Sequence, residues 1–195
     1  MGLKKITAII LSILTLLLFT GNVQAGDTIK IGFPIPLTGP FASVGDTANK
    51  ALKLAIEEYN AKGGLLGKKL EGFAMDTQDG RPEVVRAGME RLVSHGVDAL
   101  MTSYCALSPV DVQTMAKYDV PYFAGTALHI TANAIQKGMP KTRNVFHVSW
   151  TQLAYAVSHR QVLPTIPKKM GWTPPNKKMA VIRLEFPYNI APSDQ

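Results

Sequence analysis

The stretch that decides the fold is TIKIGFPIPLTGPFASVGDTANKALKLAIEEYNAKGGLLGKK, residues 28–69. Its first part, residues 28–37, is rich in apolar and β-branched side chains and ends at a turn that contains Pro and Gly. That composition is typical of a buried strand followed by its exit loop. The sequence therefore predicts that the chain enters its core on a strand.

A helix is predicted directly after this loop. The apolar residues recur at a helical spacing that places them on one stripe: Ala48, Ala51, Leu52, Ala55, Ile56 and Tyr59. Ser43 stands three residues before Asp46, an arrangement that resembles a capping box and predicts the helix start. Gly63 and Gly64 then end the helix.

The rest of the chain repeats this alternation of strand and helix. Strands are predicted at 70–76, 97–103, 120–125, 144–149 and 179–186, and helices at 81–96, 108–118 and 151–170. Alternation with crossovers of this length predicts an α/β fold, an open parallel sheet with helices on both faces. The crossovers are expected to be right-handed.

Three loops leave the carboxyl ends of these strands, where open α/β sheets bind their ligands. They are PLTGPFASVG (36–45), TSYCALSP (102–109) and AGTALHIT (124–131). Tyr104 is a pocket candidate because it combines an apolar ring with a polar tip, and Thr126 offers a hydroxyl. No G-x-G-x-x-G follows the first strand and no P-loop lysine motif is present, so no cofactor is predicted.

The N-terminus has the pattern of a secretory signal. Lys4 and Lys5 precede an apolar run at 6–19, and a small-x-small site ends at Ala25. Residues 1–25 are therefore predicted to be a signal peptide cleaved after Ala25, which directs the protein to the periplasm.

Composition argues against two other classes of partner. The net charge is +7, but the lysine and arginine residues are scattered and no basic stripe is interleaved with aromatic side chains. Binding to nucleic acid is therefore not expected. The chain has one cysteine and no Cys/His pattern with zinc spacing, so neither an internal disulfide nor a metal site is predicted.

The single cysteine, Cys105, raises the question of catalysis. A cysteine nucleophile needs a base and a group that orients it, and among the four histidines only His129 lies in a loop that could approach. No G-x-S-x-G elbow is present. The chain is predicted not to be an enzyme, with an exported cysteine hydrolase as the remoter alternative, and the thiol is expected to line a pocket or pack in the core.

Two stretches carry a family resemblance: IKIGFPIPLTGPFASVGDTANKALKLAIEEYNAKGGLLGKKLE and DTQDGRPEVVRAGMERLVSHGVDALM. They resemble the periplasmic substrate-binding proteins of branched-chain amino acid ABC transporters, over roughly residues 28–190. The resemblance implies a type I periplasmic-binding fold, in which two α/β lobes close on a ligand by a hinge. It implies an N-terminal lobe at 26–170, and a hinge crossover with the first strand of an incomplete second lobe at 171–195. A chain truncated in this way is expected to bind ligand weakly.

The resemblance also implies which positions contact the ligand. Relatives often carry an aromatic residue where this chain has Val44, and a serine that holds the ligand carboxylate where it has Ala106. A hydroxyl and a backbone N–H are expected from Thr126 and Ala127, and a covering ring from Tyr188. The full set of expected contacts is Val44, Tyr104, Cys105, Ala106, Thr126, Ala127 and Tyr188.

The implied function is the extracytoplasmic solute-binding component of an ABC transporter. Its ligand would be a branched-chain amino acid or a related small carboxylate or amide, and its protein partner a membrane permease. The protein is expected to be a monomer. A ligand-sensing module of the same fold is the alternative that the sequence leaves open.

Overall fold

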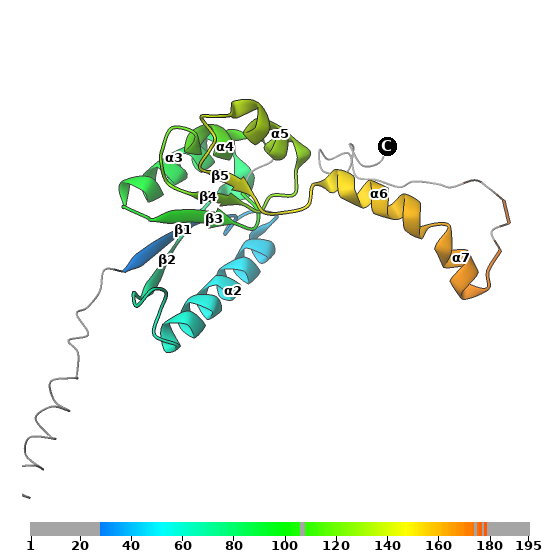
Figure 1. The fold of residues 1–195 in the computed structure, drawn as a ribbon, viewed down its shortest axis with the longest axis horizontal. Helices are drawn as coiled ribbons and strands as arrows, with labels where there is room; N and C mark the ends of the chain where they lie inside the picture. Colours follow the sequence, from blue (N-terminus) through cyan, green and yellow to red (C-terminus); the bar gives the residue numbers. More distant parts are fainter. Residues whose placement is uncertain (1–27, 106–107, 174, 177, 179–195) are drawn as a thin grey trace, which may run out of the picture.

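The computed structural model describes residues 28–105, 108–173, 175–176 and 178 (Figure 1). Along the chain the elements are β1 (Ile29–Ile35), α2 (Ala42–Ala61), β2 (Leu70–Asp76), the 3-10 turn η1 (Gln78–Gly80), α3 (Pro82–Ser94), β3 (Ala99–Thr102), α4 (Val110–Met115), β4 (Tyr122–Ala124), α5 (His129–Gly138), β5 (Val145–His147), α6 (Gln152–Val162) and α7 (Thr165–Met170). The predicted signal peptide, the strand predicted at 179–186, Ala106 and Tyr188 lie outside the described residues.

The five strands form one parallel sheet in the order β2-β1-β3-β4-β5. The order reverses beside β1, because β2 lies on one side of it and β3 on the other. This is the topological switch point at which open α/β sheets bind ligands. The predicted fold class is confirmed.

Helices cover both faces of the sheet, as predicted (Figure 1). On one face, α3, α4 and α5 bury a core that includes Leu100, Tyr122 and Val145, each no more than 5% exposed. On the other face, α2 packs over β1 and β2, where Ile56 lies above Gly72. The first and second helices of the chain therefore lie on opposite sides of the sheet.

Two helical regions differ from the prediction. Helix α5 was not predicted, because residues 129–138 mix polar and small side chains. In the structure, Thr131 is the residue of this helix that is fully buried. The single helix expected at 151–170 is divided into α6 and α7. Pro164 stands between the two, and its missing N–H cannot continue the helical hydrogen bonds.

Two helices begin later or differently than predicted, and the cap predicted at Ser43 is wrong. Helix α2 begins at Ala42 with Phe41 as its N-cap residue, so Ser43 lies inside the first turn and caps nothing. Helix α4 begins at Val110 after Pro109, and the hydroxyl of Ser108 is buried without a hydrogen-bond partner among the described residues. Part of the role expected of Ser43 is taken by a carboxylate from another element, described below.

Among the described residues, no helix is both long and apolar enough to cross a membrane.

Candidate functional site

The loop after β1 is held in place by a carboxylate at the end of β2. Asp76 accepts hydrogen bonds from the backbone N–H groups of Leu37, Thr38 and Gln78 at 2.8, 3.2 and 2.9 Å, and from Thr38 Oγ1 at 2.6 Å. Partial burial acts to raise the pKa of Asp76, but these hydrogen bonds outweigh it and hold the pKa below its ordinary value. The carboxylate thus fixes the path of the loop that follows β1.

A second carboxylate, Asp79, closes the same loop from η1. Asp79 adopts a left-handed backbone with φ 60°, and its Oδ1 accepts the backbone N–H of Phe41 at 3.1 Å. This carboxylate therefore lies at the start of α2, because Phe41 is the N-cap residue of that helix. Gly39 has φ 84°, and a Cβ there would lie 1.8 Å from Asp79 Oδ2, so only glycine fits.

Tyr104, the residue after β3 that was predicted to line a pocket, lies beside this loop. Its ring packs against Phe41 with the ring centroids 5.3 Å apart. Its hydroxyl oxygen is buried and has no hydrogen-bond partner among the described residues. Burial, followed by the charges of Asp79 and Cys105, raises the pKa of Tyr104 to about 12. The phenol is therefore neutral at physiological pH and is a hydrogen-bond donor without an acceptor.

The loops after β3 and β4 are joined by Thr126. Its Oγ1 accepts the backbone N–H of Cys105 at 3.3 Å, and its carbonyl oxygen lies 2.8 Å from His147 Nε2. Thr126 is 2% exposed. Because a hydroxyl that accepts one bond can still donate another, Thr126 connects the two loops and keeps a proton that can be donated.

The loop after β4 is also attached to the start of α6. Gln152, which is 1% exposed, donates its backbone N–H to Ala127 O at 2.8 Å. Its side-chain Oε1 accepts the backbone N–H of His129 at 2.6 Å, and its Nε2 lies 2.9 Å from His129 Nδ1. The sequence analysis missed this anchor, because a lone Gln at a helix start carries no signal for a buried role.

The predicted site residues therefore fall into three groups. Tyr104 and Thr126 lie at the carboxyl edge of the sheet with polar groups at that edge, and Ala127 lies half-buried beside them. Val44 is 49% exposed in the first turn of α2, three residues after Phe41. Cys105 is fully buried and belongs to the core.

These loops enter from strands on both sides of the switch point, so the fold gathers them as predicted. Residues 28–192 match the family model described as periplasmic binding protein. The chain belongs to the periplasmic binding protein family.

Individual members of the family show how far the similarity extends. The chain is 30% identical to Leu/Ile/Val-binding protein homolog 7 of Brucella suis biovar 1 over 180 residues, which cover 89% of this chain and 43% of that protein. Its fold is similar to that of a proposed branched-chain amino acid ABC transporter protein from Silicibacter pomeroyi, with a TM-score of 0.71 and 24% identity over 77% of this chain and 38% of the other.

A third similar protein was solved with a ligand. The branched-chain amino acid transporter substrate-binding protein of Streptococcus pneumoniae, in complex with isoleucine, gives a TM-score of 0.57 at 23% identity over 70% of this chain and 38% of the other. These two structural likenesses show the shared fold alone. The chain spans less than half the length of these relatives.

The relatives are solute-binding proteins, and the surroundings of Cys105 agree with a role other than catalysis. Burial, followed by the charge of Asp111, raises the pKa of the Cys105 thiol well above its ordinary value, and a hydrogen bond with Tyr122 opposes the shift only in part. The thiol is therefore protonated and shielded from solvent, whereas a nucleophile needs an accessible thiolate. His129, the expected base, is engaged by Gln152.

A buried polar pair beside Cys105 was not predicted. Tyr122 donates its hydroxyl to Asp111 Oδ2 at 2.7 Å, and the two side chains are 0% and 1% exposed. Burial raises the pKa of Asp111, although hydrogen bonds from Tyr122 and from backbone N–H groups, together with the charge of His147, oppose the shift.

In the part of the chain that the structure describes, no group of three or more His, Cys, Asp or Glu side chains could hold a metal ion.

Proposed function

We propose that this chain supplies the ligand-binding first lobe of an extracytoplasmic solute-binding protein. It captures a small solute at the carboxyl edge of its sheet and presents it to the membrane permease of an ABC transporter. Membership of the periplasmic binding protein family supports this role, and so do the three loops that meet at that edge. The signal peptide predicted at 1–25 would export the chain.

The observation that carries the proposal is the hydroxyl of Tyr104. A buried donor without a partner costs about 1–3 kcal/mol, because the group loses its water and gains no bond in return. An oxygen of a bound solute would satisfy this donor, and the ring of Tyr104 against Phe41 would hold it in position. The lobe thus carries a cost that a ligand with an acceptor group would relieve.

The remaining contacts in the proposal follow the shape of the edge. Thr126 donates its hydroxyl proton, Ala127 offers backbone, and Cys105 contributes through its main chain because its thiol lies in the core. Val44 supplies apolar surface from α2. Ala106 and Tyr188, which lie outside the described residues, complete the set proposed from the resemblance.

The ligand class proposed is a branched-chain amino acid or a related small carboxylate or amide. Each of these offers an oxygen to the donors named above, and charge-assisted hydrogen bonds to a carboxylate are the stronger kind. Ala106 stands where a serine is expected for a standard amino acid, which widens the proposal to simple carboxylates and amides.

A thermal-shift screen tests the proposal. Leucine, isoleucine, valine, short aliphatic and aromatic carboxylates and their amides are added to the purified chain, because a ligand that binds only the native state raises the melting temperature. The best stabiliser is then titrated by calorimetry. If no member of the set stabilises the chain, the binding role is wrong.

A matched pair of variants locates the site. Tyr104→Phe removes only the hydroxyl, so it is expected to weaken binding about 5- to 30-fold, which corresponds to about 1–2 kcal/mol for one hydrogen bond, without lowering stability. Tyr59→Phe makes the same chemical change on the exposed side of α2, at a side chain that is 53% exposed, and is expected to leave binding unchanged. Equal effects from the two variants would place the ligand elsewhere.

A further inference from the structure

A histidine on β5 contacts the loop that follows β4. His147 is the last residue of β5, and its Nε2 lies 2.8 Å from the carbonyl oxygen of Thr126. Because a carbonyl oxygen can only accept, Nε2 must carry the proton and His147 is the donor. Its other ring nitrogen, Nδ1, has no hydrogen bond to any described residue. The bond to Thr126 is therefore the hydrogen bond that orients this half-buried ring.

The backbone on either side of the Thr126–Ala127 peptide is held by other bonds. Before it, Gly125 donates its N–H to Thr102 O at 3.0 Å, and a Cβ at Gly125 would lie 2.2 Å from that oxygen. After it, Ala127 O accepts the backbone N–H of Gln152 at 2.8 Å. These bonds leave one rotation undetermined, that of the planar peptide itself about the dihedral angle on each side of it.

The hydrogen bond from His147 fixes this rotation. The Thr126–Ala127 peptide is trans, so the carbonyl of Thr126 and the N–H of Ala127 lie in one plane and point in opposite directions. The carbonyl points at His147 Nε2, and the N–H of Ala127 therefore points away from that ring. The direction of one backbone donor in the candidate site is thus determined by a side chain on the neighbouring strand.

The N–H of Ala127 is a donor without an acceptor in the part of the chain that the structure describes. Ala127 is half-buried, and it directly follows Thr126, which is 2% exposed. The peptide lies at the carboxyl edge of the sheet, where open α/β sheets bind their ligands. An acceptor oxygen at this edge would satisfy the N–H of Ala127, as it would the buried hydroxyl of Tyr104.

We propose that His147 is a positioning residue of the candidate site. It holds the Thr126 carbonyl and so presents the N–H of Ala127 to an acceptor oxygen of the bound solute. This inference rests on the proposed function, because it concerns the same site. His147 acts through the peptide and does not itself touch the solute, which gives β5 a role at an edge formed by the loops after β1, β3 and β4.

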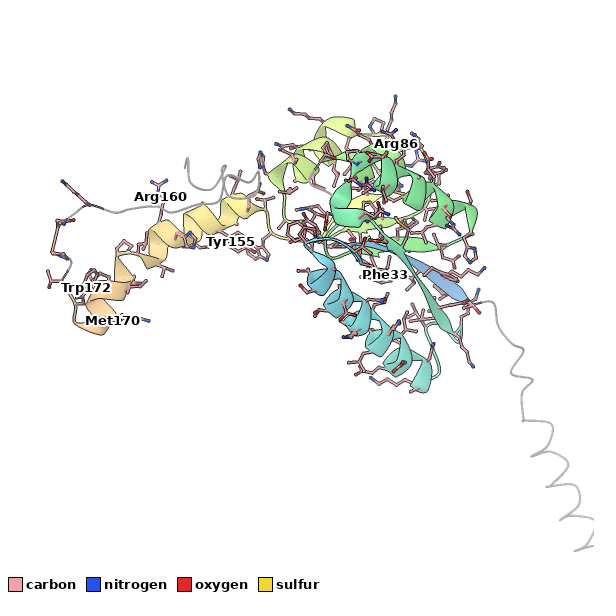
Figure 2. All side chains as sticks on the ribbon, turned by 180° about the vertical axis from the view of Figure 1, so that it is seen from behind. Phe33, Arg86, Tyr155, Arg160, Met170 and Trp172 are labelled. Carbon is pink, nitrogen blue, oxygen red and sulfur yellow. The ribbon has the colours of Figure 1, made fainter. Side chains whose placement is uncertain are left out.

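Two substitutions separate the N–H donor of His147 from its ring. His147→Gln keeps an N–H donor that can reach the position of Nε2 but has no ring and no charge, whereas His147→Leu removes the donor. His159→Leu is the control, because it removes an exposed imidazole from α6. His159 directly precedes Arg160, which Figure 2 shows on the helical arm away from the sheet. Circular dichroism of each variant verifies that it is folded.

The first measurement needs no solute. Nuclear magnetic resonance of the wild type is expected to show the ring proton of His147 on Nε2. His147→Leu should move the ¹³C resonance of the Thr126 carbonyl upfield, because that oxygen loses its donor, and His147→Gln should largely restore it. A carbonyl resonance that His147→Leu leaves unchanged would overturn the proposal, whichever solute the chain binds.

The second measurement uses 4-methylpentanoate, which has the carboxylate and side chain of leucine without the amine. Titration of the wild type is expected to move the amide proton of Ala127 downfield. His147→Leu should weaken binding about 10-fold, as for one lost hydrogen bond to a charged group, while His147→Gln and His159→Leu keep nearly the wild-type affinity.

The outcomes distinguish this inference from the proposed function. Unchanged binding in His147→Leu would overturn the positioning role. Equal losses in His147→Gln and His147→Leu would also overturn it, because the charge or shape of the ring would then matter and not its N–H. If 4-methylpentanoate does not bind the wild type, the result counts against the proposed function, and the carbonyl resonance of the free chain still decides whether His147 fixes the peptide.

Discussion

Replacing Tyr122 by Phe should show how much the buried hydrogen bond between Tyr122 and Asp111 contributes to the stability of the fold. The substitution removes one oxygen and leaves the ring, so the core keeps its shape. It takes away the hydroxyl that donates to Asp111 at 2.7 Å and leaves that carboxyl 1% exposed without its side-chain donor. Leaving one partner of a buried hydrogen bond unsatisfied costs about 1–3 kcal/mol, so we expect Tyr122→Phe to lower the free energy of unfolding by about 2 kcal/mol.

The partner substitution completes a double-mutant cycle. Asp111→Val alone leaves the buried hydroxyl of Tyr122 with the Cys105 thiol as its remaining hydrogen-bond partner among the described residues. We expect this substitution to lower the free energy of unfolding by about 1–2 kcal/mol. The double variant replaces both polar groups by apolar ones, a change that is often close to neutral or even stabilising. We therefore expect it to lie within about 1 kcal/mol of the wild type, with a coupling energy of about 2 kcal/mol.

Urea denaturation at pH 7, followed by circular dichroism, measures all four proteins. Costs that simply add in the double variant would refute the reasoning, because they would show that the two groups contribute independently. A change in the dependence of the unfolding free energy on urea would instead reveal a different denatured state, so constant slopes are required before the cycle is interpreted.

The same pair makes a prediction about pH. Burial raises the pKa of Asp111 in the folded protein, whereas the unfolded chain loses this proton near pH 4. Between these two pKa values the native state binds the extra proton, so stability falls as the pH rises through that window. The difference in the free energy of unfolding between the wild type and Asp111→Val, measured from pH 3 to pH 8, should therefore decrease as the pH rises. A difference that does not change with pH would contradict the raised pKa.

Three further outcomes are expected. Asp76→Asn should cost about 1–2 kcal/mol in urea denaturation at pH 7. Because the folded pKa of Asp76 is lowered, that advantage of the wild type should be present above about pH 4 and vanish as the pH falls through the folded pKa. Gly45→Ala should destabilise by about 1–3 kcal/mol or more in the same assay, since its Cβ would lie 1.6 Å from Pro36 O. Gln152→Ala should speed amide hydrogen exchange at His129 without unfolding the sheet, because that N–H loses its acceptor.

The fold was predictable because its signals are local. Strand β2 was predicted at 70–76 and lies at Leu70–Asp76, since a short apolar strand between a glycine-rich stop and a turn has few alternative structures. The alternation of elements then determined the parallel sheet and the edge at which the loops meet. Helix α5 was missed because it has only ten residues, and a helix this short depends on packing against the rest of the fold for its stability.

The candidate site was predictable at the level of loops and not of contacts. The bonds that shape it connect distant residues: Asp76 holds Leu37 and Thr38, which are 39 and 38 positions away. Likewise Asp111 had the pattern of an acid in the first turn of a helix, and Tyr122 that of a strand residue. Nothing local to either residue reveals that they pair inside the core.

The two carboxylates at the carboxyl edge indicate which part of a solute this lobe would bind. Asp76 is occupied by the N–H groups of the first loop, and Asp79 accepts the N–H of Phe41, so both negative charges are committed to loop geometry. Tyr104 and Thr126 are hydroxyl donors with hydrogen-bonding capacity to spare, and the hydroxyls of Ser108 and Thr131 in the same loops are buried without a partner among the described residues. We therefore expect the lobe to favour the oxygen-bearing end of a solute, and an ammonium group, where the solute has one, to find its counter-charge outside these loops. We therefore expect a carboxylate without an amine to bind and the matching amine without a carboxylate not to bind. The opposite result would show that one of the two carboxylates contacts the solute.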